Sequence, residues 1–401
     1  MVLPPENASQ DAVNQSAGRA TLRLGGLDLF PHAAATVLYD DNILIAHTNA
    51  LSDVKWTFSP GLTIAAGDVS TAFPGSVTLS QLRGLLNYSP VEDSAKPQRF
   101  LGLDYTPSFN IYTGHDRYDN VDSVAGLSAG YNFSRLVLGL DEDFSRLAVK
   151  DNNVGNLITE SVYETRLHSR YELTDRSALE VNTRYCRLDY QNPVYQGYQE
   201  VRNEDWFSRL VGARLEAGAG AAFGFVYPEF SPAQTYQEVL LRGIYRLTGK
   251  IDLRTFVGIQ FREYSSGSGD TLTPVFSLAA VYLPRPSTTV TLEGHDRVEP
   301  SCTGTYNYTL MGFNAGVSQQ LSGHLFAGLD FGYNSVVYTL LGASPSHSRS
   351  DGCLSARLGL DYEFNTRSTA GLFYTRQQNI STLQNYTYYD NLIGIQLSWR
   401  L

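Results

Sequence analysis

Ionisable side chains occupy every second position of the segment 162–173. Glu164, Arg166, His168, Arg170 and Glu172 alternate there with mainly apolar residues. Successive side chains of a β-strand point to opposite faces, so this segment would carry one charged face and one apolar face. Arginine keeps its charge at physiological pH and binds anionic groups through paired hydrogen bonds. Such a face predicts reversible contact with anionic or hydroxyl-rich solutes, and it does not predict bond-making chemistry.

The same alternation recurs along most of the chain. It predicts a polar inner wall lined by Glu164, Arg166, His168, Arg170, Arg184, Glu238, Arg242, Arg246, Arg254, Arg262, Asp330, Arg357 and Asp361. Two interpretations stay open at this point. The arginines could guide a glycan, or arginines and carboxylates could pair across neighbouring strands and stiffen the wall. Because the two signs are mixed, we expect no strong anion selectivity.

Other candidate sites are weaker. The seven histidines are scattered without a local signature, so we predict a protein that is not an enzyme and needs no cofactor. Asp40, Asp41 and Asn42, or the loop 113–122, could bind Ca²⁺, although a solvated acidic rim is the simpler interpretation, and we predict no metal. Cys302 and Cys353 could form a disulfide in an oxidising compartment, which would leave Cys186 over.

The elements that position these residues are predicted strands of about 12–14 residues, longer than strands of soluble proteins. Thirteen residues tilted by ~40° rise roughly 33 Å, enough to cross the hydrocarbon region of a bilayer. The pattern predicts eighteen strands, over 33–46, 53–66, 99–112, 122–133, 135–148, 159–172, 177–190, 204–217, 219–229, 234–247, 250–264, 270–283, 286–299, 304–319, 323–338, 350–364, 367–380 and 388–401.

Short turns alternate with longer polar loops between these strands, as in outer-membrane barrels, and the even count places both ends of the chain in the periplasm. We therefore predict an all-β, transmembrane, antiparallel up-and-down β-barrel over residues 33–401, preceded by a periplasmic segment at 1–32. Helical spacing of apolar residues near 76–88 predicts one short periplasmic helix in an insertion at about 68–98. Because no predicted loop is long, we expect no deep, inward-folded constriction.

Composition narrows the class further. The net charge of −10 argues against a nucleic-acid partner, because phosphate binding needs a basic face. The chain has no apolar run long enough for a spanning helix. It also starts without a signal peptide, and an outer-membrane location therefore implies a leader removed before Met1.

A motif in the first third of the chain resembles the outer-membrane beta-barrel porin type 2 family. The residues that carry the resemblance are Tyr39, Asp40, Asp41 and Asn42, followed by Pro60 and Gly61. The run 101–109 is also similar, and the resemblance covers most of the chain, although its motifs are specific only in the first third. The resemblance implies an outer-membrane barrel. Members of this family often accompany exopolysaccharide gene clusters, and some are proposed to help export the polymer.

From these observations we expect an outer-membrane pore that assists export of an extracellular polysaccharide through its polar lumen. The alternative is a general diffusion porin or a structural barrel unrelated to polysaccharide. The expected partners are the outer membrane with its lipopolysaccharide, the barrel-assembly machinery, and, for export, a polysaccharide and periplasmic export components. The sequence does not distinguish an open lumen from one plugged by residues 1–32 or 68–98, and it does not give the oligomeric state.

Overall fold

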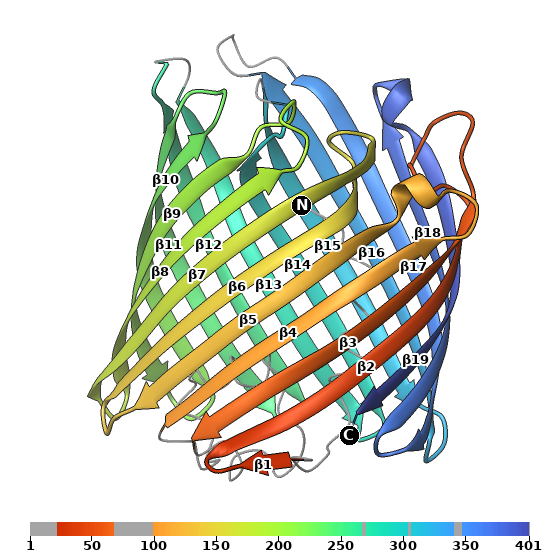
Figure 1. Cartoon of the computed structure of the whole chain (residues 1–401). Coiled ribbons are helices and arrows are strands. Elements are labelled where there is room, and N and C mark those ends of the chain that lie inside the picture. Colours follow the sequence, from red (N-terminus) through yellow and green to blue (C-terminus); the bar gives the residue numbers. More distant parts are fainter. Residues whose placement is uncertain (1–21, 68–98, 267–269, 304–305, 341–346, 401) are drawn as a thin grey trace.

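The computed structural model describes residues 22–67, 99–266, 270–303, 306–340 and 347–400. Within them, antiparallel strands pair in sequence order from β2 to β19, and β19 pairs with β2 to close the wall. Figure 1 shows the resulting cylinder of tilted strands. The predicted all-β, up-and-down antiparallel barrel of eighteen strands is confirmed.

The barrel strands run from β2 to β19, and a short β1 extends the sheet beside β2. Their bounds are β1 Leu22–Leu24, β2 Leu27–Asp40, β3 Asp53–Gly67, β4 Arg99–Tyr112, β5 Asn120–Asn132, β6 Leu136–Asp151, β7 Asn156–Thr174, β8 Ser177–Tyr190, β9 Tyr198–Val211, β10 Leu215–Pro228, β11 Gln234–Thr248, β12 Ile251–Tyr264, β13 Thr271–Arg285, β14 Thr288–Pro300, β15 Tyr306–Gln320, β16 Leu325–Leu340, β17 His347–Asn365, β18 Ser368–Ser381 and β19 Tyr388–Arg400. Two single-turn 3₁₀ helices, Asp116–Tyr118 and Gln384–Tyr386, lie in loops.

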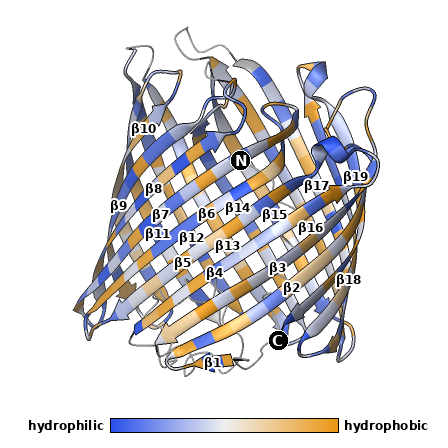
Figure 2. Ribbon diagram, in the orientation of Figure 1, coloured by the Kyte–Doolittle hydropathy of each residue, from blue (hydrophilic) through white to orange (hydrophobic). Residues whose placement is uncertain are grey.

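Hydrophobic and hydrophilic positions alternate along the strands of the wall (Figure 2). On β12, Val257, Ile259 and Phe261 are exposed on the outside, whereas Gln260 and Arg262 between them are buried on the inside. In lipid, a closed barrel satisfies every backbone hydrogen-bonding group and leaves no strand edge. The apolar exterior and the closed hydrogen-bond ladder are therefore the features that suit this chain to a bilayer.

The two rims differ in their connections. One rim, the lower in Figure 1, has tight turns at 175–176, 286–287 and 366–367, and we call it the short-turn rim. The other, the long-loop rim, includes the connections 41–52 and 191–197. The last described residue, Arg400, lies at the short-turn rim, where its backbone N–H donates to the Arg367 carbonyl.

The first barrel strand differs from its predicted bounds of 33–46. It spans Leu27–Asp40, so residues 27–32 belong to the wall and not to a preceding segment. Beyond Asp40 the chain is a loop in which Ile43 and Ile45 are fully buried, and Ile45 has a positive φ of 47°. These buried side chains continued the apolar alternation past the real end of the strand, which explains the error.

Strand β9, which corresponds to the predicted strand 204–217, also differs from the prediction. The turn expected at Gly218 lies at 212–214, where Gly212 adopts a φ of +80°, and the strand before it begins at Tyr198. Residues 198–203 looked like a loop because they are polar, but alternate members of this run face the polar lumen. The insertion at 68–98 with its predicted helix, and most of the segment 1–32, lie outside the described residues. No helix among the described residues is long and apolar enough to cross a membrane.

Candidate functional site

The interior of the barrel carries the charged rows that the sequence predicted. By the alternation of exposed apolar and inward polar positions, the structure places thirteen candidate residues on the inward-facing rows: Glu164, Arg166, His168, Arg170, Arg184, Glu238, Arg242, Arg246, Arg254, Arg262, Asp330, Arg357 and Asp361. Their part in passing a solute stays a prediction. The structure shows which of them meet and which are left facing the lumen.

The most buried charges form a network across β7, β8, β10 and β11. The Glu180 carboxylate contacts both Arg170 and Arg242, and the Arg242–Glu180 distance is 2.8 Å. Glu216 lies 3.4 Å from each of the same guanidinium groups. The Arg242 guanidinium also covers the ring of Trp206 at 4.7 Å. Here arginine and carboxylate pair and stiffen the wall, which is the second of the two interpretations left open by the sequence.

A second paired group continues along β9, β11 and β12. Arg202 lies 2.7 Å from both Glu204 and Glu238, and Gln260 donates to Glu238 at 2.6 Å. Arg262 is nearly fully buried and donates to Gln234 at 2.6 Å. Arg202 was missed because residues 191–203 were interpreted as a loop, and Glu204 was not singled out although it begins the predicted strand 204–217. The inward alternation of Glu200, Arg202 and Glu204 was the signal that could have identified them.

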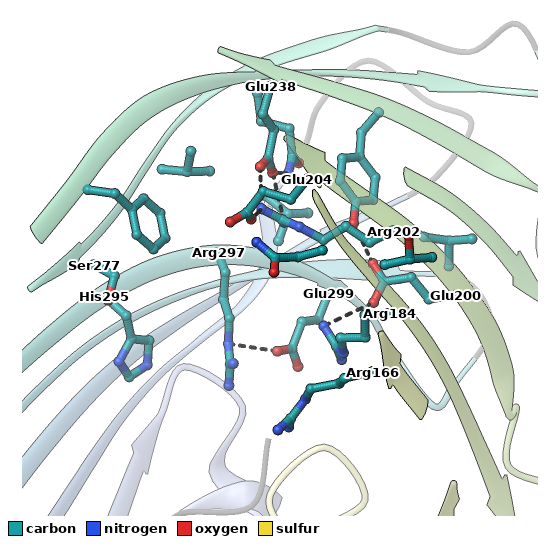
Figure 3. Close-up of a pocket in the computed structure, with 18 of the residues that line it drawn as sticks. Arg166, Arg184, Glu200, Arg202, Glu204, Glu238, Ser277, His295, Arg297 and Glu299 are labelled. Carbon is teal, nitrogen blue, oxygen red and sulfur yellow. Dashed lines mark hydrogen bonds and ion pairs between the residues drawn. The ribbon is translucent and has the colours of Figure 1, made fainter. Parts of the chain in front are cut away.

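Three other arginines leave much of their side chain exposed to a cavity of about 520 Å³ inside the barrel. The exposed fractions are 47% for Arg166, 38% for Arg184 and 44% for Arg297. Figure 3 shows these guanidinium groups converging from β7, β8 and β14, with Arg297 paired to Glu299 at 2.7 Å. Arg297 was not among the predicted residues, although it alternates with Glu293, His295 and Glu299 in a predicted strand.

The remaining predicted residues lie elsewhere on the wall. Arg246 and Arg254 share Asp252 near the short-turn rim, at 3.6 and 3.3 Å. Arg357, whose register partner on β16 is Asp330, stacks on the ring of Phe373 at 4.1 Å. These groups are separate from the cavity at β7–β9 and β14. The charged wall is therefore not one continuous arginine track.

Apolar side chains also face the lumen, and sequence reasoning missed them. Trp206, Ala222, Leu240 and Val275 form a buried cluster, with Phe256 packed against it, on the inward rows of β9 to β13. Trp206 and Leu240 lie inside mainly polar rows, so a simple apolar-outside pattern gave no signal for them. The cavity therefore has both cationic and apolar lining, because Phe256 and Val275 belong to it as well.

The mouth of the barrel is narrowed by the hairpin between β6 and β7. Pairing of β6 with β5 ends at Arg146, and pairing of β7 with β8 ends at Glu160, so the residues between them extend as a free hairpin. Its tip reaches across the mouth to β19, where Asn152 accepts a 2.6 Å hydrogen bond from the Tyr388 hydroxyl. The expectation of no inward-folded constriction was therefore wrong, because a short turn on two long strands can also fold inward.

Two ionic contacts anchor this hairpin. Lys150 Nζ lies 2.7 Å from both Asp40 and Asp390, and both carboxylates are almost completely buried. On the other side of the tip, Arg349 pairs with Asp351 and donates to the Asn153 carbonyl at 3.1 Å. The anchors join β6 to β2, β17 and β19 across the mouth.

The candidate Ca²⁺ ligands have other partners. Among the described residues, Asp40, Asp41 and Asp390 form the one group of carboxylates close enough to hold a metal ion. The Lys150 ammonium neutralises two of them, and Asp41 accepts hydrogen bonds from the backbone and side chain of Asn391 at 2.7 and 2.6 Å. The Lys150 ammonium thus supplies the positive charge beside Asp40 and Asp390, although Asp390 Oδ1 is buried without a hydrogen-bond partner.

The second candidate Ca²⁺ site, the loop 113–122, is used in the same way. Asp119 accepts from the Tyr112 backbone N–H at 2.7 Å, and Asp122 accepts from the Ala148 N–H at 2.8 Å. Both carboxylates therefore order the loop and the neighbouring strand ends.

The residues of the family-like motif have structural contacts. Asn42 donates to the carbonyls of Ala46 and Tyr389, which holds the first loop against β19, and Tyr39 is exposed on the outside. A Cβ at Gly61 would lie 2.1 Å from His32 Nε2, so this position requires glycine while His32 reaches Thr106. Pro60 lies two residues from Phe58, where regular pairing with β4 is interrupted until Leu62.

The three cysteines are free thiols. Cys353 donates to Asn379 at 3.1 Å, and Cys302 lies in the β14–β15 loop with its carbonyl bonded to the Gln196 N–H. The disulfide considered for Cys302 and Cys353 is not formed. Burial raises the pKa of the Cys302 thiol above its ordinary value.

Comparison with known proteins found solved structures of similar outline. OccAB3 of Acinetobacter baumannii is 10% identical with a TM-score of 0.47, over 93% of this chain and 100% of that one. OccAB4 of the same organism is 11% identical with a TM-score of 0.45, over 97% and 100%. The outer membrane protein opdK from Pseudomonas aeruginosa is 12% identical with a TM-score of 0.43, over 93% and 99%.

No protein-family model and no curated protein matches the chain. The resemblance to the outer-membrane beta-barrel porin type 2 family therefore stays a prediction. The assignment of the fold rests on the strand pairing described above, which closes an eighteen-stranded antiparallel barrel.

Proposed function

We propose that the protein is a bacterial outer-membrane channel through which small polar and charged solutes diffuse. Its closed ladder and apolar exterior meet the requirements of a spanning segment in lipid. Barrels of sixteen to eighteen strands are wide enough to leave an aqueous interior. The polar inner rows supply hydrogen-bonding partners for a solute that has left bulk water.

The observation that carries this proposal is the cavity inside the barrel. Its volume of about 520 Å³ lies within the range of sites for small molecules. Arg166, Arg184 and Arg297 keep exposed guanidinium surface there, beside carboxylates that neutralise them only in part. Exposed ion pairs of this kind contribute only about 0–1 kcal/mol, so a passing solute can displace and restore them.

Polysaccharide export, the function expected from the family resemblance, would need a path for a continuous chain of sugars. The β6–β7 hairpin instead reaches across the mouth, with Lys150 bonded to Asp40 and Asp390. The cavity inside the barrel is of small-molecule size. We therefore prefer the diffusion channel, which was the alternative at the sequence level.

Liposome swelling with uncharged sugars of increasing size tests the proposal. Purified protein is reconstituted, and swelling rates are compared for a monosaccharide, a trisaccharide and a hexasaccharide. We expect fast entry of the monosaccharide and a steep fall with size, because the cavity limits the path. Swelling that is absent for all three sugars, or equally fast for all three, would contradict the proposal.

A further inference from the structure

The pairing of neighbouring strands in the wall is interrupted between β13 and β14 near the long-loop rim. Pairing between these strands runs from Arg285–Thr288 up to Phe276–Asp296 and ends there. Beyond that point, residues 271–275 pair with β12 alone, and residues 297–300 pair with β15 alone. In the part of the chain that the structure describes, the two strands thus separate, and we call residues 271–276 and 296–300 the β13–β14 fork.

Contacts on the inner side hold β14 away from β13. Arg262, on β12, donates to the Val298 carbonyl at 3.2 Å and so replaces a strand partner for this group. Just after β14, the Cys302 carbonyl accepts from the Gln196 N–H at 2.7 Å, which ties the loop to the far side of the barrel. On the other edge, Pro274 has no N–H to offer to a ladder. The fork is therefore fixed by side-chain bonds and by sequence.

The fork opens within the apolar exterior. Phe261 and Leu272 face each other across β12 and β13 beyond the last β13–β14 pair, and both are exposed on the outside. Leu272 is 71% exposed, and Ile259 lies two residues below Phe261 on the same outer face. On its β12 and β13 side the fork therefore borders the apolar exterior of the barrel.

The cavity inside the barrel lies against the inner side of this fork. Its lining includes Arg166 and Arg297 from inward rows, and also Phe276, Asp296 and Val298, which alternate with the inward residues of their strands. Figure 3 shows Ser277 and His295, the inward-facing pair next to the fork, beside the cavity.

We propose that the β13–β14 fork is a lateral portal through which a single-chain amphiphile with an anionic head passes between the lumen and the adjacent leaflet. The head binds the exposed guanidinium groups of Arg166, Arg184 and Arg297. The tail lies along Val275 and Phe256 of the apolar cluster. Contact with an apolar tail would explain why this cluster lies inside a mainly polar lumen. An aqueous solute needs neither the apolar lining nor a gap in the wall.

The portal is tested with two cysteine variants in a protein whose natural cysteines are replaced by serine. Ser277→Cys lies on the inward row next to the fork and lines the cavity, whereas Ala279→Cys lies two residues further from the fork on the same row and is not part of the cavity lining. Both are reconstituted in liposomes that contain a phospholipid with a maleimide attached to its acyl chain. We expect the lipid-borne maleimide to label Ser277→Cys at least tenfold faster than Ala279→Cys, while a small water-soluble maleimide labels both. Equal labelling from the lipid, or none at either position, would overturn the portal.

The ligand class is tested by protection with laurate. Laurate should slow the labelling of Ser277→Cys by the water-soluble maleimide, and dodecanol at equal membrane concentration should protect less. Adding Arg297→Gln should raise the half-protecting laurate concentration about tenfold, whereas Arg254→Gln, near the short-turn rim, should leave it unchanged. Protection that is equal for laurate and dodecanol, or unaffected by Arg297→Gln, would overturn the anionic head. Sugar permeation is a separate outcome, because a barrel with a sealed wall could still conduct.

Discussion

Replacement of Lys150 by methionine should release the β6–β7 hairpin from the mouth of the barrel. The Lys150 ammonium is the partner of two carboxylates, Asp40 and Asp390, at 2.7 Å each. Both carboxylate side chains are at most 3% exposed, and Lys150 itself is 16% exposed. Methionine keeps the length of the apolar stem but leaves two buried negative charges side by side.

The size of the effect follows from the burial. Removing one partner of a buried ion pair costs about 3–5 kcal/mol, because the remaining charge stays desolvated. Even the lower value changes the ratio of closed to open hairpin by roughly 150-fold. The Arg349 anchor on the other side of the tip remains, so we expect a mobile hairpin and not an unfolded one.

Single-channel recording in planar bilayers measures the outcome. Lys150→Met should show more frequent or larger openings than the unchanged protein. Lys250→Met is the matched control, because Lys250 lies at the short-turn rim and donates to the Pro284 carbonyl. If Lys150→Met conducts like the control, the hairpin is not held by this contact and the reasoning fails.

Three further outcomes are expected. Arg170→Ala removes a nearly buried partner of Glu180, so it should lower the free energy of unfolding by about 3 kcal/mol and the barrel should unfold at a lower temperature on heated gels. Arg254 is half exposed, so Arg254→Ala should lower the free energy of unfolding by less than about 1 kcal/mol. Burial raises the pKa of the Cys302 thiol, so the thiol stays protonated at pH 8. Mass spectrometry should therefore find Cys302 unlabelled by maleimide until the protein is denatured. Rapid labelling of the native protein would be inconsistent with the structure. Reversal potentials in a salt gradient should show weak ion selectivity, because the cavity lining holds five arginines and six carboxylates.

The strand pattern was readable from the sequence because a barrel wall imposes one rule over its whole length. Each strand alternates between lipid and lumen, so β4 and β8 were predicted with the bounds that the structure shows, 99–112 and 177–190. The errors occurred where that rule ends. Ile43 and Ile45 are buried in a loop, and the polar start of β9 faces the lumen.

The site was less predictable because it depends on which rows come together in space. Alternation places Arg166 and Arg297 on inward faces, but it does not show that the two side chains line the same cavity. The inward fold of the β6–β7 hairpin depends on the contact of Lys150 with Asp390, 240 positions along the chain. Neither contact leaves a local signal in a single sequence.

The alternation of the wall is the claim on which the rest depends, and a scan of one strand tests it most directly. Nitroxide labels at each position from 257 to 262, in a protein without its natural cysteines, report access to oxygen in the lipid and to a water-soluble nickel complex. We predict that labels at Val257, Ile259 and Phe261 respond to oxygen, and that labels at Gln260 and Arg262 respond less to it than their neighbours do. A scan without a period of two, or with the arginine position in the lipid, would contradict the account.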